Sequence, residues 1–191
     1  MSAASIRLSV LIPSVPERFA HLTRVYGALI EQVGDRPVEV LVLVDNKRRT
    51  TGHKRNDLVR LARGEYVAFV DDDDRIGNDY IAELLRAIDT KADCILFDVM
   101  VNNDGVPDRI CRYDRRFRDV KLPTEYRRKP NHLMCYRREI ALRHEFRDQS
   151  FGEDGDWAAR ASRDIRTQTY IRKTLYHYDY VAKALDWYYA S

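Results

Sequence analysis

Four consecutive aspartates, Asp71 to Asp74, directly follow a short and mostly apolar run, Glu65 to Val70. With Gly64 before it, this run is typical of a buried strand. Acidic side chains at the carboxyl end of such a strand lie where open α/β sheets bind ligands, and their oxygens suit a divalent cation. A solvated turn would also account for four aspartates, because Asp is common in turns.

The residues that follow favour a site over a plain turn. Asp79 to Ile88 carry Ile81, Leu84, Leu85 and Ile88 at helical spacing. A strand, an acidic loop and a helix therefore follow one another in the order that builds ligand sites. This order predicts a metal-assisted enzyme that acts on a phosphate compound.

Other segments predict a sheet that could position the aspartates. We expect strands and helices to alternate along the first half, as strand 6–12 ended by Pro13 and Pro16, helix 17–33, strand 38–44, helix 52–63 and, after the acidic loop, strand 93–101. In helix 52–63 we expect Leu58, Leu61 and Ala62 to face inward and Gly64 to end the helix. The alternation predicts an α/β fold with a Rossmann-like, mostly parallel central sheet flanked by helices.

Composition limits the class of protein. The chain has 191 residues, 45% of them hydrophobic, which suits a single domain with a core, and its formal net charge is only +3. Three cysteines, Cys94, Cys111 and Cys135, lack metal-type spacing, which argues against zinc and for a reducing compartment. No segment approaches the roughly 20 apolar residues of a membrane span, and no secretory signal is evident. We expect a cytoplasmic protein of a bacterium or a virus-infected cell.

Several motifs together resemble the inverting family 2 glycosyltransferases, which have the GT-A fold. In chain order they are Pro13 with Arg18, Asp45 at a strand end, Gly52 to Asn56 (similar to G-x-x-R-N), Ala62 to Asp74 (similar to A-x-G-E-Y-hydrophobic-D-x-D-D), Gly152 to Asp156 (similar to G-E-D-x-D), and His177. The resemblance covers most of the chain. It implies a nucleotide-sugar and metal-binding half, residues 1–101, and a smaller acceptor-binding and catalytic-base half, residues 102–191, of one domain.

The resemblance implies roles for the acidic residues of the first half. Asp73 is expected to bind Mg²⁺ or Mn²⁺ directly, and Asp71 to face the ribose or a metal-bound water. The roles of Asp72 and Asp74 stay open. His177 could complete the metal shell or touch the diphosphate, although a partly buried histidine bonded to a carbonyl is an equal alternative. Residues expected to bind the nucleoside diphosphate sugar are Pro13, Arg18, Asp45, Lys54, Arg55, Asp71 and Asp72.

Three of these residues have simpler alternative roles. Asp45 could accept a hydrogen bond from the base or merely stabilise a turn with Asn46. Lys54 and Arg55, near a helix start, could face phosphate, which helix N-termini attract, or could be ordinary solvent-facing charges.

In the second half, the resemblance makes Asp154 the general base that takes the proton of the acceptor hydroxyl. Glu153 and Asp156 could orient Asp154 or the acceptor. The alternative is that Asp154 or Glu153 caps the helix through Trp157, and both roles are compatible.

Between the halves, residues 109–129 contain nine basic residues and three acidic ones, interleaved with aromatics. They could form a solvated, irregular segment, or they could bind a polyanionic acceptor such as DNA. Among relatives in bacterial viruses the acceptor can be a modified, for example hydroxymethylated, DNA base, which must be flipped out to react. Next to this stretch, Asn131 and His132 could line the site or serve the core.

Two other functions fit the sequence less well. A nucleotidyltransferase would want a glycine-rich phosphate loop, which Pro13 to Pro16 do not supply. A non-catalytic nucleic-acid-binding module would gain nothing from Asp71 to Asp74. The aromatic stretch Tyr176 to Tyr189 is interpreted as a lid, a dimer contact or core.

Overall fold

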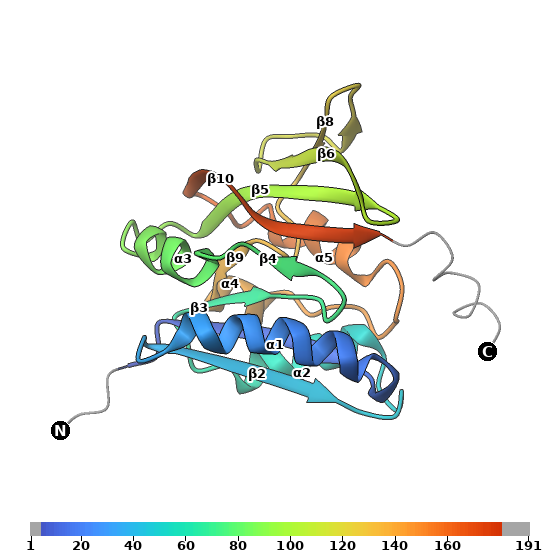
Figure 1. Cartoon of the computed structure of the whole chain (residues 1–191). Helices are drawn as coiled ribbons and strands as arrows, with labels where there is room; N and C mark the ends of the chain where they lie inside the picture. Colours follow the sequence, from blue (N-terminus) through green and yellow to red (C-terminus); the bar gives the residue numbers. More distant parts are fainter. Residues whose placement is uncertain (1–4, 181–191) are drawn as a thin grey trace.

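The structure is a computed structural model that describes residues 5–180, and its ten strands form one mixed sheet with helices on both faces (Figure 1). The elements of the first half are β1 (Leu8–Ser14), η1 (Pro16–Arg18), α1 (Phe19–Val33), β2 (Val38–Val44), α2 (Thr51–Leu61), β3 (Tyr66–Phe69), β4 (Arg75–Ile76), α3 (Tyr80–Ile88) and β5 (Cys94–Asn103). Those of the second half are β6 (Val106–Tyr113), β7 (Val120–Lys121), β8 (Glu125–Arg128), β9 (Cys135–Arg137), α4 (Arg138–Arg143), α5 (Glu153–Ala161) and β10 (Gln168–Tyr180). The predicted α/β class is confirmed.

Strands β2, β1 and β3 form the parallel unit that carries the acidic loop. Every residue of β1 is buried, as expected for a strand between two others with helices on both faces. β1 continues through Pro13 and Ser14, beyond the predicted end at Ile12. Because β3 pairs with β1 only as far as Leu11, β1 has one partner at Pro13, and proline is tolerated at such an edge.

Helix α1 packs Leu22, Val25 and Leu29 into the core, as their spacing predicts. Helix α2 buries Leu58, but the prediction for Leu61 is wrong, because Leu61 is 64% exposed and Val59 is buried instead. Gly64 does not end α2 either.

The need for glycine at position 64 comes from a close approach of two backbone segments. A Cβ on Gly64 would lie 2.6 Å from the backbone nitrogen of Ser9, and the Gly64 N–H donates to the Ser9 hydroxyl at 2.8 Å. Glycine therefore lets the chain enter β3 tightly against β1.

The middle of the sheet departs from simple alternation. β9, from the second half, lies between β3 and β5 and is antiparallel to both, so β3 and β5 run in the same direction without touching. β10 pairs in parallel with β5 and in antiparallel fashion with the two-residue β4, which directly follows the acidic loop. The last long strand is thereby brought beside the aspartates.

The second half is continuous with the first. Asp104 and Gly105, where composition changes, form the hairpin turn between the paired strands β5 and β6, and their positive φ angles of 49° and 81° suit a turn of this kind. The basic stretch is not irregular, because it contributes to β6, β7 and β8 at one end of the sheet (Figure 1).

Within residues 5–180, no helix is long and apolar enough to cross a membrane. The three cysteines are buried and unpaired.

Candidate functional site

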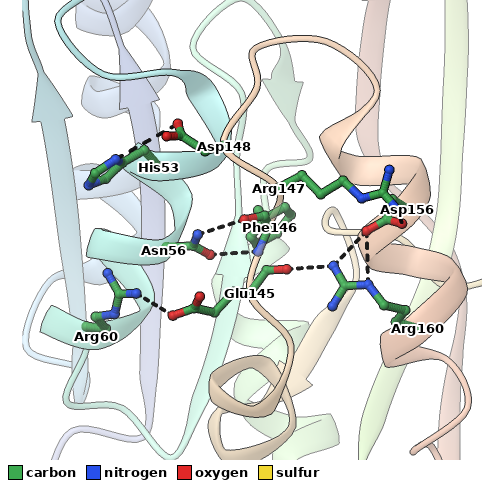
Figure 2. Close-up of a pocket in the computed structure, with 9 residues that line it drawn as sticks. All are labelled: His53, Asn56, Arg60, Glu145, Phe146, Arg147, Asp148, Asp156 and Arg160. Atoms are coloured by element: carbon green, nitrogen blue, oxygen red, sulfur yellow. Dashed lines mark hydrogen bonds and ion pairs between the residues drawn. The ribbon is translucent and has the colours of Figure 1, made fainter.

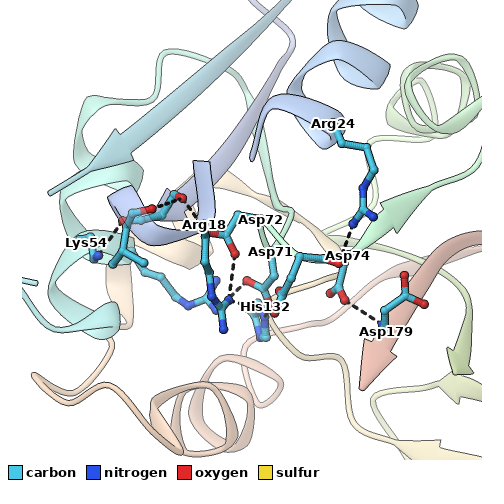
Figure 3. A network of polar contacts seen from close by, with 12 residues as sticks. Arg18, Arg24, Lys54, Asp71, Asp72, Asp74, His132 and Asp179 are labelled. Carbon is cyan, nitrogen blue, oxygen red and sulfur yellow. Dashed lines mark hydrogen bonds and ion pairs between the residues drawn. The ribbon is translucent and has the colours of Figure 1, made fainter. Parts of the chain in front are cut away.

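Two of the four aspartates point into the protein. Asp72 is buried at the end of β1, where it accepts hydrogen bonds from the Ser14 hydroxyl at 2.6 Å and from Arg18 at 2.9 Å (Figure 3). Because β1 and β3 are parallel, their carboxyl ends meet at one edge of the sheet, and Ser14 therefore reaches Asp72. Asp72 thus ties η1 to the acidic loop.

Asp74 is buried on the other side of the loop. It accepts a hydrogen bond from the Tyr176 hydroxyl at 2.7 Å and another from the backbone N–H of Asp179 at 2.9 Å. Tyr176 in turn accepts the backbone N–H of Asp71 at 3.0 Å. Burial, together with the nearby charges of Asp71 and Asp73, raises the pKa of Asp74 well above its usual range.

Asp73 is the most accessible of the four carboxylates, with 37% of its side chain exposed and Arg18 at 2.9 Å. Partial burial and the carboxylates of Asp71 and Asp72 raise its pKa, although Arg18 opposes this rise. A divalent cation would neutralise this crowding of negative charge, and carboxylate oxygens suit Mg²⁺ or Mn²⁺. The acidic loop therefore fits such an ion.

The described part of the chain gathers no group of three His, Cys, Asp or Glu side chains that could hold a metal by themselves. Mg²⁺ commonly binds through one or two carboxylates together with the phosphates of its substrate. Asp73 could supply the protein's part of such a site.

Asp71 forms an ion pair with a buried arginine, Arg55. The Arg55 guanidinium is only 4% exposed and contacts Asp71 at 2.9 Å and Glu153 of α5 at 3.3 Å, with the rings of Phe69 and Phe146 at 5.1 and 5.8 Å from its centre. The solvent-facing alternative for Arg55 is therefore wrong. Burial alone would raise the pKa of Asp71, but Arg55 and His132 hold it well below its usual range.

His132 connects the acidic loop to the predicted base. Its Nε2 lies 3.2 Å from Asp71 and its Nδ1 lies 3.6 Å from Asp154 at the start of α5. Figure 3 shows His132 directly beside Asp71. Asp154 keeps 40% of its side chain exposed, whereas its neighbour Glu153 is buried against Arg55. The structure thus brings Asp71 and Asp154 to one place, although 83 positions separate them in the sequence (154 − 71).

Neither Glu153 nor Asp154 is the N-cap residue of α5, so the helix-capping alternative is wrong. α5 begins after Gly152, which occupies the N-cap position with φ 74°, so Glu153 and Asp154 lie within the first turn. Asp156 does not orient Asp154. It pairs with Arg160 at 2.7 Å and with Arg147 at 2.8 Å.

Asp45 and Lys54 form a second buried pair beside the loop. The Lys54 ammonium donates to the Ser14 carbonyl at 2.8 Å and lies 3.2 Å from Asp45, so Lys54 is not a solvent-facing charge. Both carboxylate oxygens of Asp45 are buried without a hydrogen-bond partner in the described structure. Such a carboxylate is suited to accept hydrogen bonds from a ligand.

His177 lies away from Asp73. It is paired with Arg75 in the β10–β4 register, and burial followed by the Arg75 charge lowers its pKa. Side chains alternate along β10, so Tyr176 faces the acidic loop and His177 faces the other way. Metal binding by His177 stays a prediction. Of the aromatic stretch, Tyr176 belongs to the core, and residues 181–191 lie outside the described residues.

A separate cavity of about 500 Å³ lies on the other side of α2 (Figure 2). His53, Asn56 and Arg60 line it from α2, and Asp156 and Arg160 line it from α5. Asn56 fixes the segment between them, because its amide donates to the Phe146 carbonyl at 2.9 Å and accepts the Phe146 N–H at 2.8 Å. None of the four aspartates lines this cavity, so it is distinct from the acidic loop.

Sequence reasoning missed the role of Tyr176 and left that of His132 open. Tyr176 stands next to His177 in the sequence. Successive side chains of a strand point to opposite faces of the sheet, and this alternation is the only signal that could have shown which of the two faces the acidic loop. Tyr178 shares the face of Tyr176. Burial, followed by the charges of Asp74 and Asp71, raises the pKa of Tyr178.

Residues 26–149 match the family model of glycosyl transferase family 2. The chain is also 25% identical over 163 residues to EpsH of Bacillus subtilis (strain 168), a protein named as a candidate glycosyltransferase. That match covers 71% of this chain and 43% of EpsH.

Crystal structures of S. aureus TarS 1–349 are similar in fold. The structure determined without a named ligand has a TM-score of 0.65 and 20% sequence identity to this chain. The complex with UDP has a TM-score of 0.66 and 19% identity, and the complex with UDP-GlcNAc has a TM-score of 0.64 and 16% identity. Each match covers 91% of this chain, and this chain spans only 58–60% of those TarS chains. At these identities the likeness concerns the fold, and it confirms the predicted GT-A type.

Proposed function

The chain belongs to glycosyl transferase family 2, and from this premise we propose that it transfers a sugar from a nucleoside diphosphate sugar to an acceptor hydroxyl, with inversion. The observation that carries the proposal is the contact of His132 with both Asp71 and Asp154. This contact joins the carboxylate predicted to face the donor to the partly exposed carboxylate predicted to serve the acceptor, which supports a shared site.

The donor site would use the carboxyl edge of β1 and β3. The Asp45 carboxylate, whose oxygens accept no hydrogen bond in the described structure, would accept hydrogen bonds from the base, and Asp71 would face the ribose or a metal-bound water. Lys54 would hold Asp45 in place through their 3.2 Å contact, and Arg18 would lie near the diphosphate because it already contacts Asp73. UDP is the first nucleotide to test, since TarS has been crystallised with UDP and UDP-GlcNAc.

Mg²⁺ or Mn²⁺ would be held by Asp73. When bound, such an ion neutralises the charge that develops on the departing diphosphate. Arg18 already compensates part of the Asp73 charge at 2.9 Å, and the ion would complete this compensation.

Asp154 would take the proton of the acceptor hydroxyl as its oxygen attacks the anomeric carbon opposite the leaving group. The hydroxyl O–H bond breaks, a new C–O bond forms, and the electron pair of the old C–O bond leaves with the diphosphate. General-base assistance of this kind typically contributes ~10²–10⁴-fold in rate. The partial exposure of Asp154 leaves it accessible to an acceptor, whereas buried Glu153 would act by fixing Arg55.

A polyanionic acceptor, such as DNA carrying a hydroxymethylated base, is the more specific form of the proposal. Arg115 and Arg118 are exposed just after β6 and have no ion-pair partner within residues 5–180. Other arginines of this region are paired with acids, as Arg112 and Arg127 are with Glu125, so the free positive charge is limited.

Donor screening tests the proposal. Thermal shifts would be measured with UDP, GDP, ADP, CDP and dTDP, each with MnCl₂ and with EDTA, followed by nucleotide release from the matching sugar donor. We expect one nucleotide to stabilise the protein only with metal, and Asp73→Asn to lose that metal dependence. If no nucleotide stabilises the protein and EDTA changes nothing, the transferase proposal fails.

The DNA acceptor is tested separately. Binding to hydroxymethylated and unmodified DNA would be compared at rising salt, and log K should fall linearly with log salt if phosphates are contacted. Salt-independent binding, or none, would remove the polyanion form of the proposal while leaving sugar transfer untouched.

A further inference from the structure

His132 is a buried, titratable side chain between the two groups assigned to chemistry, and the mechanism above gives it no role. It lies in the segment between β8 and β9 and is 5% exposed. Its position is fixed on several sides. The Asn131 side chain accepts the Leu133 N–H at 3.2 Å, the Asn131 carbonyl accepts the Met134 N–H at 3.2 Å, and the Phe69 ring meets the imidazole edge-on.

The contact with Asp71 sets which nitrogen carries a proton. An ionised carboxylate can only accept hydrogen bonds, and Arg55 at 2.9 Å keeps Asp71 ionised, so the His132 Nε2 at 3.2 Å must donate. Both oxygens of Asp71 are then occupied, Oδ1 by Arg55 and Oδ2 by His132. The ring is thereby held with Nδ1 pointing away from Asp71.

Nδ1 is buried, has no hydrogen-bond partner in the described part of the chain, and lies 3.6 Å from Asp154 Oδ2. With Nε2 protonated, a neutral imidazole presents a lone pair at Nδ1. A lone pair facing an ionised carboxylate is unfavourable, whereas the same lone pair can accept a hydrogen bond from a carboxylic acid. Nδ1 is therefore suited to accept a hydrogen bond from Asp154 whenever the Asp154 carboxyl group carries a proton.

We propose that His132 is a positioning residue for the base, and that Nδ1 receives the hydrogen bond of Asp154 once Asp154 has taken the acceptor's proton. The transferred proton stays on Asp154, and no further bond is made or broken. His132 also links Asp154 to Asp71, so that the base is aligned only when the donor-side carboxylate is in place. This inference rests on the proposed transferase function and adds a residue to it.

The charged groups around His132 come from three elements. Asp71 belongs to the acidic loop, Asp154 to α5, and Arg55, which contacts both Asp71 and Glu153, to α2. The carboxylates of Asp71 and Asp154 contact the ring itself, and Arg55 acts on it through Asp71. The effect of His132 on Asp154 must therefore be separated from its effect on Asp71.

Two substitutions separate these contacts. The Gln side chain of His132→Gln can place an amide N–H near the position of Nε2, which keeps the donation to Asp71 and loses the group beside Asp154. The shorter side chain of His132→Asn can place an amide oxygen near the position of Nδ1, which keeps an acceptor for Asp154 and loses the contact with Asp71.

The experiment measures UDP release from UDP-GlcNAc with MnCl₂ and water as the acceptor, UDP affinity by calorimetry, and the pH dependence of kcat. For His132→Gln we expect UDP affinity close to wild type, kcat lower by about 10- to 100-fold through misalignment of the base, and a shifted acidic limb of the pH profile. His132→Asn should recover part of kcat and bind UDP less tightly. Wild-type kcat and pH profile in His132→Gln would overturn the inference, and so would equal losses of affinity and kcat in both variants.

A second measurement does not depend on turnover. Imidazole ¹⁵N spectra of the wild-type protein should report a protonated Nε2 and an Nδ1 that carries a lone pair, and Asp154→Asn, whose side-chain amide can donate to that lone pair, should shift the Nδ1 signal with little change at Nε2. An unchanged Nδ1 signal would overturn the inference. If the wild-type protein releases UDP from no donor while the Nδ1 signal responds to Asp154, the proposed function fails and the contact stands.

Discussion

The guanidinium of Arg55 joins Asp71 to Glu153 across the site, at 2.9 and 3.3 Å. One buried cation on α2 thus neutralises a carboxylate of the acidic loop and a carboxylate at the start of α5. A buried arginine with two acidic partners is stable only while both contacts are made, because an unpaired buried charge is costly. The relative position of the acidic loop and the predicted base therefore depends on Arg55.

Replacing Arg55 by lysine should loosen this arrangement. A single ammonium cannot reproduce the fork that contacts Asp71 through one nitrogen and Glu153 through another. We expect the free energy of unfolding to fall by on the order of 2 kcal/mol, as for other hydrogen bonds to charged groups, together with a loss of transferase activity. Chemical denaturation and UDP release would measure the two effects.

Arg60→Lys is a matched control on the same helix. The Arg60 side chain is 52% exposed and pairs with Asp57 and Glu145 at the surface, where ion pairs contribute ~0–1 kcal/mol. Equal losses of stability for the two variants would contradict the role given to Arg55.

Removal of the side-chain charge should affect different properties at the neighbouring residues Asp154 and Glu153, namely turnover at Asp154 and thermal stability at Glu153. Asp154→Asn should reduce turnover by ~10²–10⁴-fold and leave the melting temperature and UDP affinity near wild type, because this side chain is partly exposed. Glu153→Gln should lower the melting temperature, because Glu153 is buried against Arg55. Full turnover in Asp154→Asn would mean that another group is the base.

Much of this site follows from local patterns in the sequence. Asp71 to Asp74 follow a buried strand, and Tyr66 to Phe69 form β3 as their apolar character predicts. The partners of these aspartates were not predictable in the same way. Glu153 reaches Arg55 and Asp154 reaches His132 only because α5 packs beside α2, and such long-range contacts leave no periodic signal.

Other features of the site and the fold leave no clear signal in the sequence. Lys54 and Arg55 had a solvent-facing alternative because basic residues rarely lie in cores unless they are paired, and the sequence does not show that Lys54 pairs with Asp45 or Arg55 with Glu153, 98 positions away. β7 and β8 were missed because they are only two and four residues long and rich in charge. The pairing of β8 with β6 and of β7 with β8 stabilises them, where propensity alone would not.

Gly52 should be required for the position of the segment before α5. Its N–H donates to the Gln149 carbonyl at 3.0 Å, and a Cβ at this position would lie 1.9 Å from the Arg147 carbonyl oxygen. Backbone cannot yield as a flexible side chain can, so Gly52→Ala should cost ~1–3 kcal/mol of stability and shift the segment that leads to Asp154. Chemical denaturation would give the first value, and UDP release would report the second.

Gly27→Ala is the control for this substitution. Gly27 lies within α1, and a Cβ there would meet no atom within 4 Å. Alanine should therefore stabilise the helix by about 0.5–1 kcal/mol. Destabilisation of similar size at positions 52 and 27 would show that the close approach to Arg147 does not explain the glycine.

Asp74 should destabilise the metal-free protein as the pH rises. Because burial and two neighbouring carboxylates raise its folded pKa, Asp74 is protonated in both states below its ordinary pKa of 3.8 and costs nothing there. Above that value the unfolded chain ionises more readily than the folded one, so stability falls with rising pH through this group. Asp74→Asn, which stays neutral, should raise the melting temperature in EDTA more at pH 7 than at pH 4.

Asp114 supplies the opposite case within the same chain. Hydrogen bonding from Arg116 lowers its pKa from 3.8 to about 2, so its stabilising effect is present at neutral pH and is lost only as the pH falls from 3.8 towards 2. Asp114→Asn should therefore lower the melting temperature at pH 7, where Asp74→Asn raises it. Melting curves of both variants across pH 4 to 8 would test the contrast. A fall in melting temperature for Asp74→Asn at pH 7 would show that its hydrogen bonds to Tyr176 and Asp179 outweigh the cost of its buried charge.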